Sequence, residues 1–213
     1  MKTFFQITIL TTLLLGTLGC NQKKNGTGDP SSIVPTIDAK PTVSGSNNTA
    51  TLNLTKQILI VLKAKDYAKL SEYISPTSGL ILSPYGIVDT VQNIKLSKAT
   101  IATMVNDKAT MLWGKYEGSG EPIQLTANDY FAKFVYAADY ANADSTNYNK
   151  MVAPSNTPSN VATIYTNNSY TESYMAGKDA NMQGKDWRSL VLVYKEENGN
   201  TYLAGIVHNQ WKP

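Results

Sequence analysis

The stretch that decides the fold is DWRSLVLVYKEENGNTYLAGIVHNQW, residues 186–211 of a 213-residue chain. Two runs rich in β-branched and aromatic residues flank Asn198-Gly199, and such runs are typical of paired strands. Asn-Gly is the preferred pair for a type I′ turn, because both central residues of that turn take positive φ. The stretch therefore predicts an antiparallel hairpin in which Glu197 faces Asn200.

The register of this hairpin decides which side chains share a face of the sheet. Counting back from the turn pairs Val191 with Ile206 and Ser189 with His208. Both faces are then largely apolar, so we expect the hairpin to be covered on both sides. A slip of one residue would exchange the faces, and the pattern alone leaves both registers open.

Further β patterns precede the hairpin. Residues 161–166 and 170–175 are rich in β formers and extend the hairpin into an antiparallel meander. Residues 141–160 are polar and contain two prolines, which predicts a long loop. Short strands are expected at residues 80–82 and over residues 109–116.

Helical patterns fill the first part of the domain and the gaps between strands. Apolar residues recur at helical spacing over residues 54–62 and again over residues 67–74, where Asp66 is a suitable N-cap. Shorter helices are expected over residues 97–105 and after Thr126, which starts a sequence similar to a capping box.

This order of elements resembles the NTF2-like (cystatin-like) α+β cone. The resemblance covers most of residues 50–213 and rests on element order. It implies N-terminal helices packed on a curved antiparallel sheet, with a pocket at the open end of the cone. We therefore expect a single α+β domain over residues 50–213, a length that can bury a core.

The residues before this domain have the composition of an export signal and a tether. Residues 1–19 hold one lysine and a mostly apolar run, the layout of a secretory signal peptide. Thr17-Leu18-Gly19-Cys20 resembles the lipobox of bacterial lipoproteins, although Thr17 stands where leucine is usual. That resemblance implies lipid attachment to Cys20; the alternative is an ordinary secreted protein with a chance cysteine. Residues 20–49 contain no aromatic residue and predict a flexible linker spanning roughly 30 Å.

A lipid anchor on Cys20 implies an exported protein of the bacterial cell envelope. Asn21 is not the aspartate associated with inner-membrane retention in many enteric-type bacteria, which favours the outer membrane in a host with two membranes. Of 19 basic side chains 18 follow the signal segment, against 16 acidic ones, a net of +2. This balance argues against nucleic acid as a partner. The expected partners are the membrane and either a small-molecule, glycan or peptide ligand or an envelope protein.

Four stretches look like a family of uncharacterised bacterial envelope lipoproteins. They are Ser83-Pro84-Tyr85 and residues 118–123, 186–190 and 205–211. The resemblance implies an envelope location and supplies no reaction.

The candidate chemistry gathers around His208, the only histidine and therefore the easiest acid–base group near neutral pH. Ser189 beside it and Asp186 nearby invite a hydrolase interpretation, but a serine inside a paired strand lacks an exposed nucleophile elbow. We interpret His208 as a half-buried structural side chain. Asp186 and Arg188 flank Trp187 and either form an ion pair or bind the polar end of a ligand. A zinc site is not expected with one histidine and one cysteine, and no cofactor is expected.

Aromatic content points to binding. The chain holds 13 tyrosines and 3 tryptophans, some of which we expect to line a pocket. The ligand-binding candidates are Trp187, Arg188, His208 and Trp211. The favoured function is a non-enzymatic binding module. The alternatives are a small pocket enzyme of isomerase, dehydratase or hydrolase type, using His208 with a carboxylate, and a structural subunit of an envelope complex.

Overall fold

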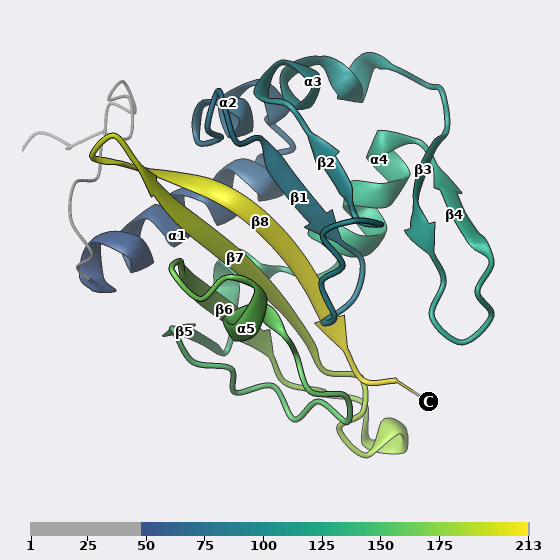
Figure 1. Ribbon diagram of the computed structural model, residues 1–213. Coiled ribbons are helices and arrows are strands. Elements are labelled where there is room, and N and C mark those ends of the chain that lie inside the picture. Colours follow the sequence, from purple (N-terminus) through teal and green to yellow (C-terminus); the bar gives the residue numbers. More distant parts are fainter. Residues whose placement is uncertain (1–47, 213) are drawn as a thin grey trace, which may run out of the picture. The chain divides into compact units, whose positions relative to one another are not determined.

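The computed structural model describes residues 48–212 (Figure 1). The expected signal peptide, Cys20 and nearly all of the expected linker lie outside the described residues. In chain order the elements are α1 (Asn48–Ala64), α2 (Tyr67–Glu72), β1 (Leu80–Ser83), β2 (Ile94–Leu96), α3 (Lys98–Thr103), η1 (Met104–Asn106), β3 (Met111–Lys115), β4 (Pro122–Leu125), α4 (Ala127–Tyr130), η2 (Phe131–Val135), η3 (Tyr140–Asn142), β5 (Ser145–Tyr148), α5 (Val161–Ile164), β6 (Ser169–Met175), η4 (Ala180–Met182), β7 (Arg188–Glu197) and β8 (Asn200–Gln210).

The main sheet has six strands in the order β2-β1-β8-β7-β6-β5, and β3 and β4 form a separate hairpin. Neighbours in the main sheet are antiparallel except β1 and β8, which pair in parallel. The expected α+β class is confirmed, with a curved sheet and a few helices, but the sheet is mixed and not wholly antiparallel (Figure 1). The finer assignment to the NTF2-like cone stays a prediction.

Helix α1 packs on the sheet through one stripe, as the helical spacing predicts. The buried side chains of that stripe are Thr51, Leu54, Thr55, Ile58, Leu59 and Leu62. The hydroxyl of Thr55 forms hydrogen bonds with Thr171 Oγ1 at 2.9 Å and Tyr194 OH at 2.7 Å. All three hydroxyls are buried and satisfied by one another, so a polar contact fixes α1 over β6 and β7.

The short helices begin where their N-caps predict. The side chains of Asp66, Ser97 and Thr126 each accept a hydrogen bond from the backbone N–H three residues on, at 2.9, 3.0 and 3.2 Å. Such caps satisfy amides that have no partner inside the helix. Helix α4 continues directly into η2, a π-helical turn over Phe131–Val135.

Two segments differ from the expectation. Residues 161–166, expected as a strand, begin with α5 (Val161–Ile164), whose Val161 is fully buried under the sheet. Tertiary burial overrides the β propensity of its branched residues. The expected loop 141–160 contains the edge strand β5 (Ser145–Tyr148), in which every residue is half-buried. A polar edge strand carries no apolar alternation, so its sequence resembles a loop.

The β7–β8 hairpin has the predicted turn. Asn198 and Gly199 both have positive φ, 52° and 74°, and Glu197 pairs with Asn200. The predicted register holds as far as the pair of Tyr194 and Leu203.

Beyond that pair the predicted register is wrong by one residue. Val193 pairs with Gly205, which leaves Ala204 as the extra residue of a β-bulge. From there to the strand ends, Val191 pairs with Val207 instead of Ile206, because the bulge shifts β8 by one position.

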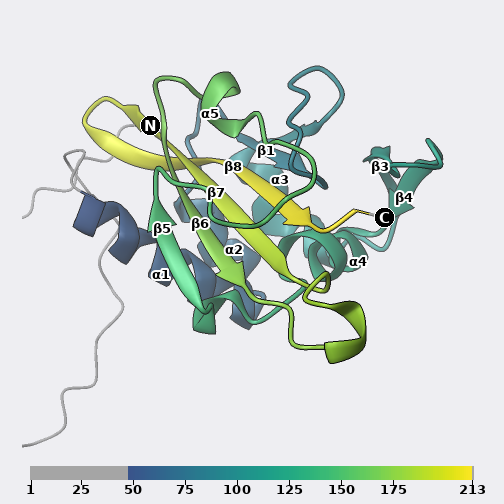
Figure 2. The same cartoon turned by 90° about the horizontal axis from the view of Figure 1, so that it is seen from below.

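Both faces of the sheet are covered, as the hairpin sequence predicts. On the helix side, Leu190, Leu192 and Ile206 belong to the larger core. On the other side, Val191, Val193 and Val207 form a smaller core with apolar residues of the 86–93 and 149–168 loops. Figure 2 shows the loop around α5 passing in front of β6 and β7, with α1 and α2 behind them.

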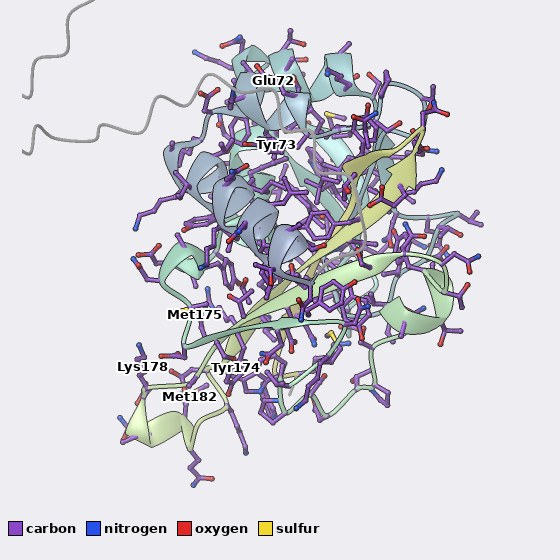
Figure 3. The ribbon with its side chains drawn as sticks, turned by 90° about the vertical axis from the view of Figure 1, so that its left-hand side faces the viewer. Glu72, Tyr73, Tyr174, Met175, Lys178 and Met182 are labelled. Atoms are coloured by element: carbon purple, nitrogen blue, oxygen red, sulfur yellow. The ribbon has the colours of Figure 1, made fainter. Side chains whose placement is uncertain are left out.

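The two ends of the domain carry different elements. Figure 3 shows α2, with Glu72 and Tyr73, at one end and the turn after β6, with Lys178 and Met182, at the other. Within residues 48–212 no helix is long and apolar enough to cross a membrane.

Candidate functional site

The sheet separates the predicted serine–histidine pair. Ser189 pairs with Asn209, and Leu190 pairs with His208. Cross-strand partners share a face and successive residues alternate, so Ser189 and His208 lie on opposite faces. Ser189 Oγ instead donates to Glu172 Oε1 at 2.8 Å. The bulge at Ala204 thus removes the arrangement that suggested a hydrolase.

Glu172 is a fully buried carboxylate that the alternating sequence of β6 concealed. Besides Ser189 it accepts hydrogen bonds from the backbone N–H groups of Val152 and, at 3.2 Å, Ala153. These three donors satisfy a buried charge that is otherwise costly. Through the amides of Val152 and Ala153, Glu172 therefore holds the 149–168 loop against the face of the sheet that carries the smaller core.

His208 lies in the core and is only 1% exposed. Its Nε2 is 3.2 Å from Gln210 Oε1, and its ring packs edge-on against Phe134, with centroids 6.0 Å apart. Burial, the largest cause, lowers the pKa of His208 to about 4. The imidazole is therefore neutral at pH 7, and no described carboxylate is hydrogen-bonded to it. The pairing of His208 with a carboxylate, on which the enzyme alternative depends, is not found among residues 48–212.

Asp186 and Arg188 do not form an ion pair with each other. Asp186 Oδ2 accepts hydrogen bonds from the backbone N–H groups of Lys178 at 2.8 Å and Asp179 at 3.0 Å, which lower the pKa of its carboxyl. Arg188 Nη1 donates to the carbonyl oxygen of Ala137 at 2.9 Å. Asp186 orders a turn, whereas Arg188 keeps an exposed guanidinium.

The two tryptophans of this region differ in exposure. Trp187 is 2% exposed and packs near Tyr174, with ring centroids 6.3 Å apart. Trp211 is half-buried, and Lys185 Nζ lies 5.0 Å from its ring centroid. Trp187 is thus a core residue, while Trp211 is available to a ligand.

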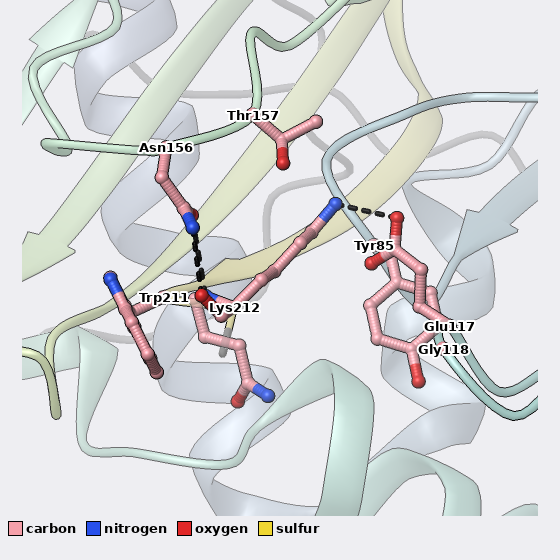
Figure 4. A pocket seen from close by; sticks show the side chains of 8 residues that line it. Tyr85, Glu117, Gly118, Asn156, Thr157, Trp211 and Lys212 are labelled. Atoms are coloured by element: carbon pink, nitrogen blue, oxygen red, sulfur yellow. Dashed lines mark hydrogen bonds and ion pairs between the residues drawn. The ribbon is translucent and has the colours of Figure 1, made fainter.

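One depression, here called the Trp211 pocket, lies beside the end of β8 and has a volume of about 340 Å³ (Figure 4). Its lining includes Tyr85, Glu117, Asn156, Gln210, Trp211 and Lys212. Lys212 Nζ pairs with Glu117 Oε1 at 2.6 Å, and Asn156 Nδ2 donates to the Lys212 carbonyl oxygen at 2.7 Å. The charges of this pocket compensate one another.

A second depression, the Arg188 pocket, has a volume of about 420 Å³. Two alanines and six larger residues line it: Tyr85, Tyr116, Lys133, Phe134, Arg188 and Gln210. Tyr85 and Gln210 also line the Trp211 pocket, so the two depressions adjoin. Of the four ligand-binding candidates, Arg188 and Trp211 line these pockets and Trp187 and His208 do not.

Distant segments build this double pocket. Tyr85 follows β1, Tyr116 follows β3, Lys133 and Phe134 lie on η2, and Gln210 ends β8. The four stretches quoted above for a lipoprotein resemblance each contribute a lining residue. Sequence reasoning missed Lys133 and Phe134 as site residues because their helical pattern indicated only an amphipathic helix.

No metal centre is indicated within residues 48–212, where no group of three or more His, Cys, Asp or Glu side chains is placed to hold an ion. The double pocket offers aromatic rings, amides and cations, which suit ligand binding, and the carboxylate in its lining, Glu117, is paired with Lys212.

Comparison with known proteins gives no family. No protein-family model matches the chain, and no curated protein matches it. One solved structure to which it is similar is described as "Putative calcium/calmodulin dependent protein kinase II association domain" from Xanthomonas campestris. The match has 11% sequence identity and a TM-score of 0.35, and covers 79% of this chain and 91% of that chain. A likeness this weak supports no conclusion about fold or function.

Proposed function

We propose that the chain is a lipid-anchored protein of the bacterial cell envelope whose domain binds a ligand in the double pocket at the end of β8. The observation that carries the proposal is the adjoining pair of depressions, which share Tyr85 and Gln210 and present rings and cations to solvent. Pockets of a few hundred Å³ lined by rings and a few polar groups are typical of small-molecule sites.

The surroundings of His208 favour binding over catalysis. Within residues 48–212 the only hydrogen-bond partner of its imidazole is Gln210, a residue of both pockets, and Phe134 of the Arg188 pocket packs on its ring. A buried, neutral imidazole beneath Gln210 acts as a support that holds the amide in place.

The anchor is proposed from the sequence around Cys20. Two or more acyl chains would hold the protein stably at a membrane, and the linker over residues 20–49 would let the domain reach ligands away from the lipid surface. Mass spectrometry of the N-terminal peptide should find a diacylglyceryl group on Cys20 and none in Cys20→Ser. An unmodified cysteine in the mature protein would contradict the anchor.

Binding is tested by a thermal-shift screen of the full chain, purified in detergent, against envelope glycans, peptides and metabolites. A ligand at about 100 times its Kd should stabilise the fold by about 2.7 kcal/mol and raise Tm by roughly 5–10 °C. Gln210→Ala, which alters both pockets, should abolish the shift, and Gln57→Ala on the exposed side of α1 should retain it. A ligand whose shift survives Gln210→Ala binds elsewhere and contradicts the proposed site.

A further inference from the structure

The two adjoining pockets differ in charge balance. In the Trp211 pocket, Glu117 pairs with Lys212 at 2.6 Å. The Arg188 pocket has Lys133 and Arg188 in its lining and no carboxylate. Neither cation forms an ion pair with a carboxylate of residues 48–212. A local excess of positive charge therefore faces a depression lined by rings.

Both cations are held in place by neutral groups. Lys133 Nζ donates to Tyr116 OH at 3.1 Å and lies 4.6 Å from the centroid of the Tyr116 ring. Arg188 Nη1 donates to the Ala137 carbonyl oxygen at 2.9 Å. An ammonium has three donors and a guanidinium has five, so each cation keeps donors for a ligand after these contacts. Positioned cations lose less side-chain entropy when an anion binds.

The segment that carries Lys133 has an unusual backbone. It belongs to η2, a π-helical turn that also places Phe134 in the pocket and, through Phe134, against His208. Single π-helical turns are rare and occur frequently at functional sites. The local helix geometry thus combines a cation and a ring at the same depression.

The rings limit the ligand class. Tyr85, Tyr116 and Phe134 line the depression, and the Tyr85 and Phe134 rings meet edge to face with centroids 5.8 Å apart. Such surfaces favour a flat or ring-shaped apolar body. The planar guanidinium of an arginine can form two parallel hydrogen bonds with a planar carboxylate, which a lysine ammonium cannot do. Arg188 is the only arginine of the chain.

We propose that the Arg188 pocket binds the carboxylate of a small ring-bearing acid, with the anion between Lys133 and Arg188 and the ring against Tyr85, Tyr116 and Phe134. This rests on the proposed function and names the chemical class of its ligand. The neighbouring Trp211 pocket, with balanced charges, receives the uncharged remainder of a larger ligand of this class.

Benzoate and benzamide test the proposal because they match in size and shape and differ in charge. Each is titrated into the ¹⁵N-labelled full chain in detergent while amide shifts are followed, with inorganic phosphate as a third probe. Benzoate should shift amides of residues 132–137 and Gln210 and bind about tenfold more tightly than benzamide, the effect of one charge-assisted interaction. Lys133→Gln and Arg188→Gln should each weaken benzoate about tenfold, while Lys56→Gln, on exposed α1, leaves it unchanged.

The outcomes separate this proposal from the general one. Equal binding of benzoate and benzamide at the same amides would overturn the carboxylate preference and leave a ligand pocket in place. Phosphate binding without benzoate binding would show a bare anion site and overturn the ring-bearing class. If no probe changes any amide chemical shift, the proposal of a ring-bearing acid is overturned. The proposed binding function is tested separately, by the thermal-shift screen.

Discussion

At its turn end the β7–β8 hairpin carries Glu197, whose carboxylate accepts hydrogen bonds from Ser75, Thr77 and Ser78 and pairs with Lys195 at 2.9 Å. At its open end Arg188 faces a pocket without any carboxylate in the lining. At the first end, the charges of Glu197 and Lys195 both have partners within the fold. At the second end Arg188 has no ion-pair partner among residues 48–212, although its charge interacts with that of nearby Asp186. This contrast separates charges that stabilise the fold from charges available to a ligand.

The bulge at Ala204 lies between the two ends and sets the face of every later β8 residue. Deleting Ala204 removes the extra residue, so Val193 can still pair with Gly205 and Leu190 with His208, now without a bulge. We expect the deletion to lower the free energy of unfolding by about 1–3 kcal/mol in urea denaturation, and His208 to stay buried. Ala204→Ser keeps the residue count and should cost less than about 1 kcal/mol. A deletion variant whose His208 titrates with a pKa near 6.5 would contradict the assignment of Ala204 as the extra residue.

His208 makes the pocket end sensitive to mild acid. Burial lowers its folded-state pKa from 6.5 to about 4, so the unfolded chain takes up a proton first as the pH falls. Stability should be complete above pH 6.5 and decline down to pH 4, by up to about 3 kcal/mol. Urea denaturation of wild type and His208→Gln at pH 7, 6 and 5 checks this, since the variant lacks this contribution. Parallel pH profiles for the two proteins would contradict it.

Glu197 makes the turn end sensitive only to stronger acid. Hydrogen bonds, first from Ser75 and then from Ser78, lower the pKa of its carboxyl from 4.5 to about 2. The stabilisation is therefore present above pH 4.5 and lost as the pH falls towards 2. Glu197→Gln should cost about 2 kcal/mol at pH 7, measured by urea denaturation. Glu121→Gln, on the exposed β3–β4 turn, is the matched control and should change the free energy of unfolding little. An equal loss of unfolding free energy in both variants would mean that the hydrogen bonds of Glu197 contribute no stability.

Lys133 should contribute almost nothing to the fold. Its contacts are an exposed hydrogen bond with Tyr116 and cation–π contacts with the rings of Tyr116 and Phe134. Lys133→Gln should change Tm by less than about 2 °C in differential scanning calorimetry. A loss as large as that of Glu197→Gln would place Lys133 among the structural charges and cancel the contrast between the ends.

Local signals in the sequence predicted much of the fold. Some features depend only on neighbours within a few residues and can therefore be predicted from the sequence pattern. They are the turn at Asn198-Gly199, the cap at Asp66 and the apolar stripe of α1. The bulge at Ala204 has no positive φ to mark it, and its one local signal, the isolated Gly205 that follows it inside the strand pattern, was missed. Strand β5 was missed because a polar edge strand gains its order from β6 and not from its own residues.

The candidate site was less predictable than the fold. Arg188 and Trp211 were named from the hairpin alone, and both line the double pocket. His208 was named for its chemistry, yet the bulge buries it beneath that pocket. Lys133 and Tyr85 come from segments about 50 and 100 residues earlier than Arg188 in the chain, and only the tertiary fold brings such distant side chains together.

We propose that His208 is a buried support beneath a binding pocket and not an accessible base. Because it is the only histidine, the Hε1 and Hδ2 protons of its imidazole each give one NMR signal in the full chain. We predict that both signals titrate with a pKa of about 4 and shift when benzoate occupies the neighbouring pocket. Titration near 6.5, with no response to benzoate, would contradict the account.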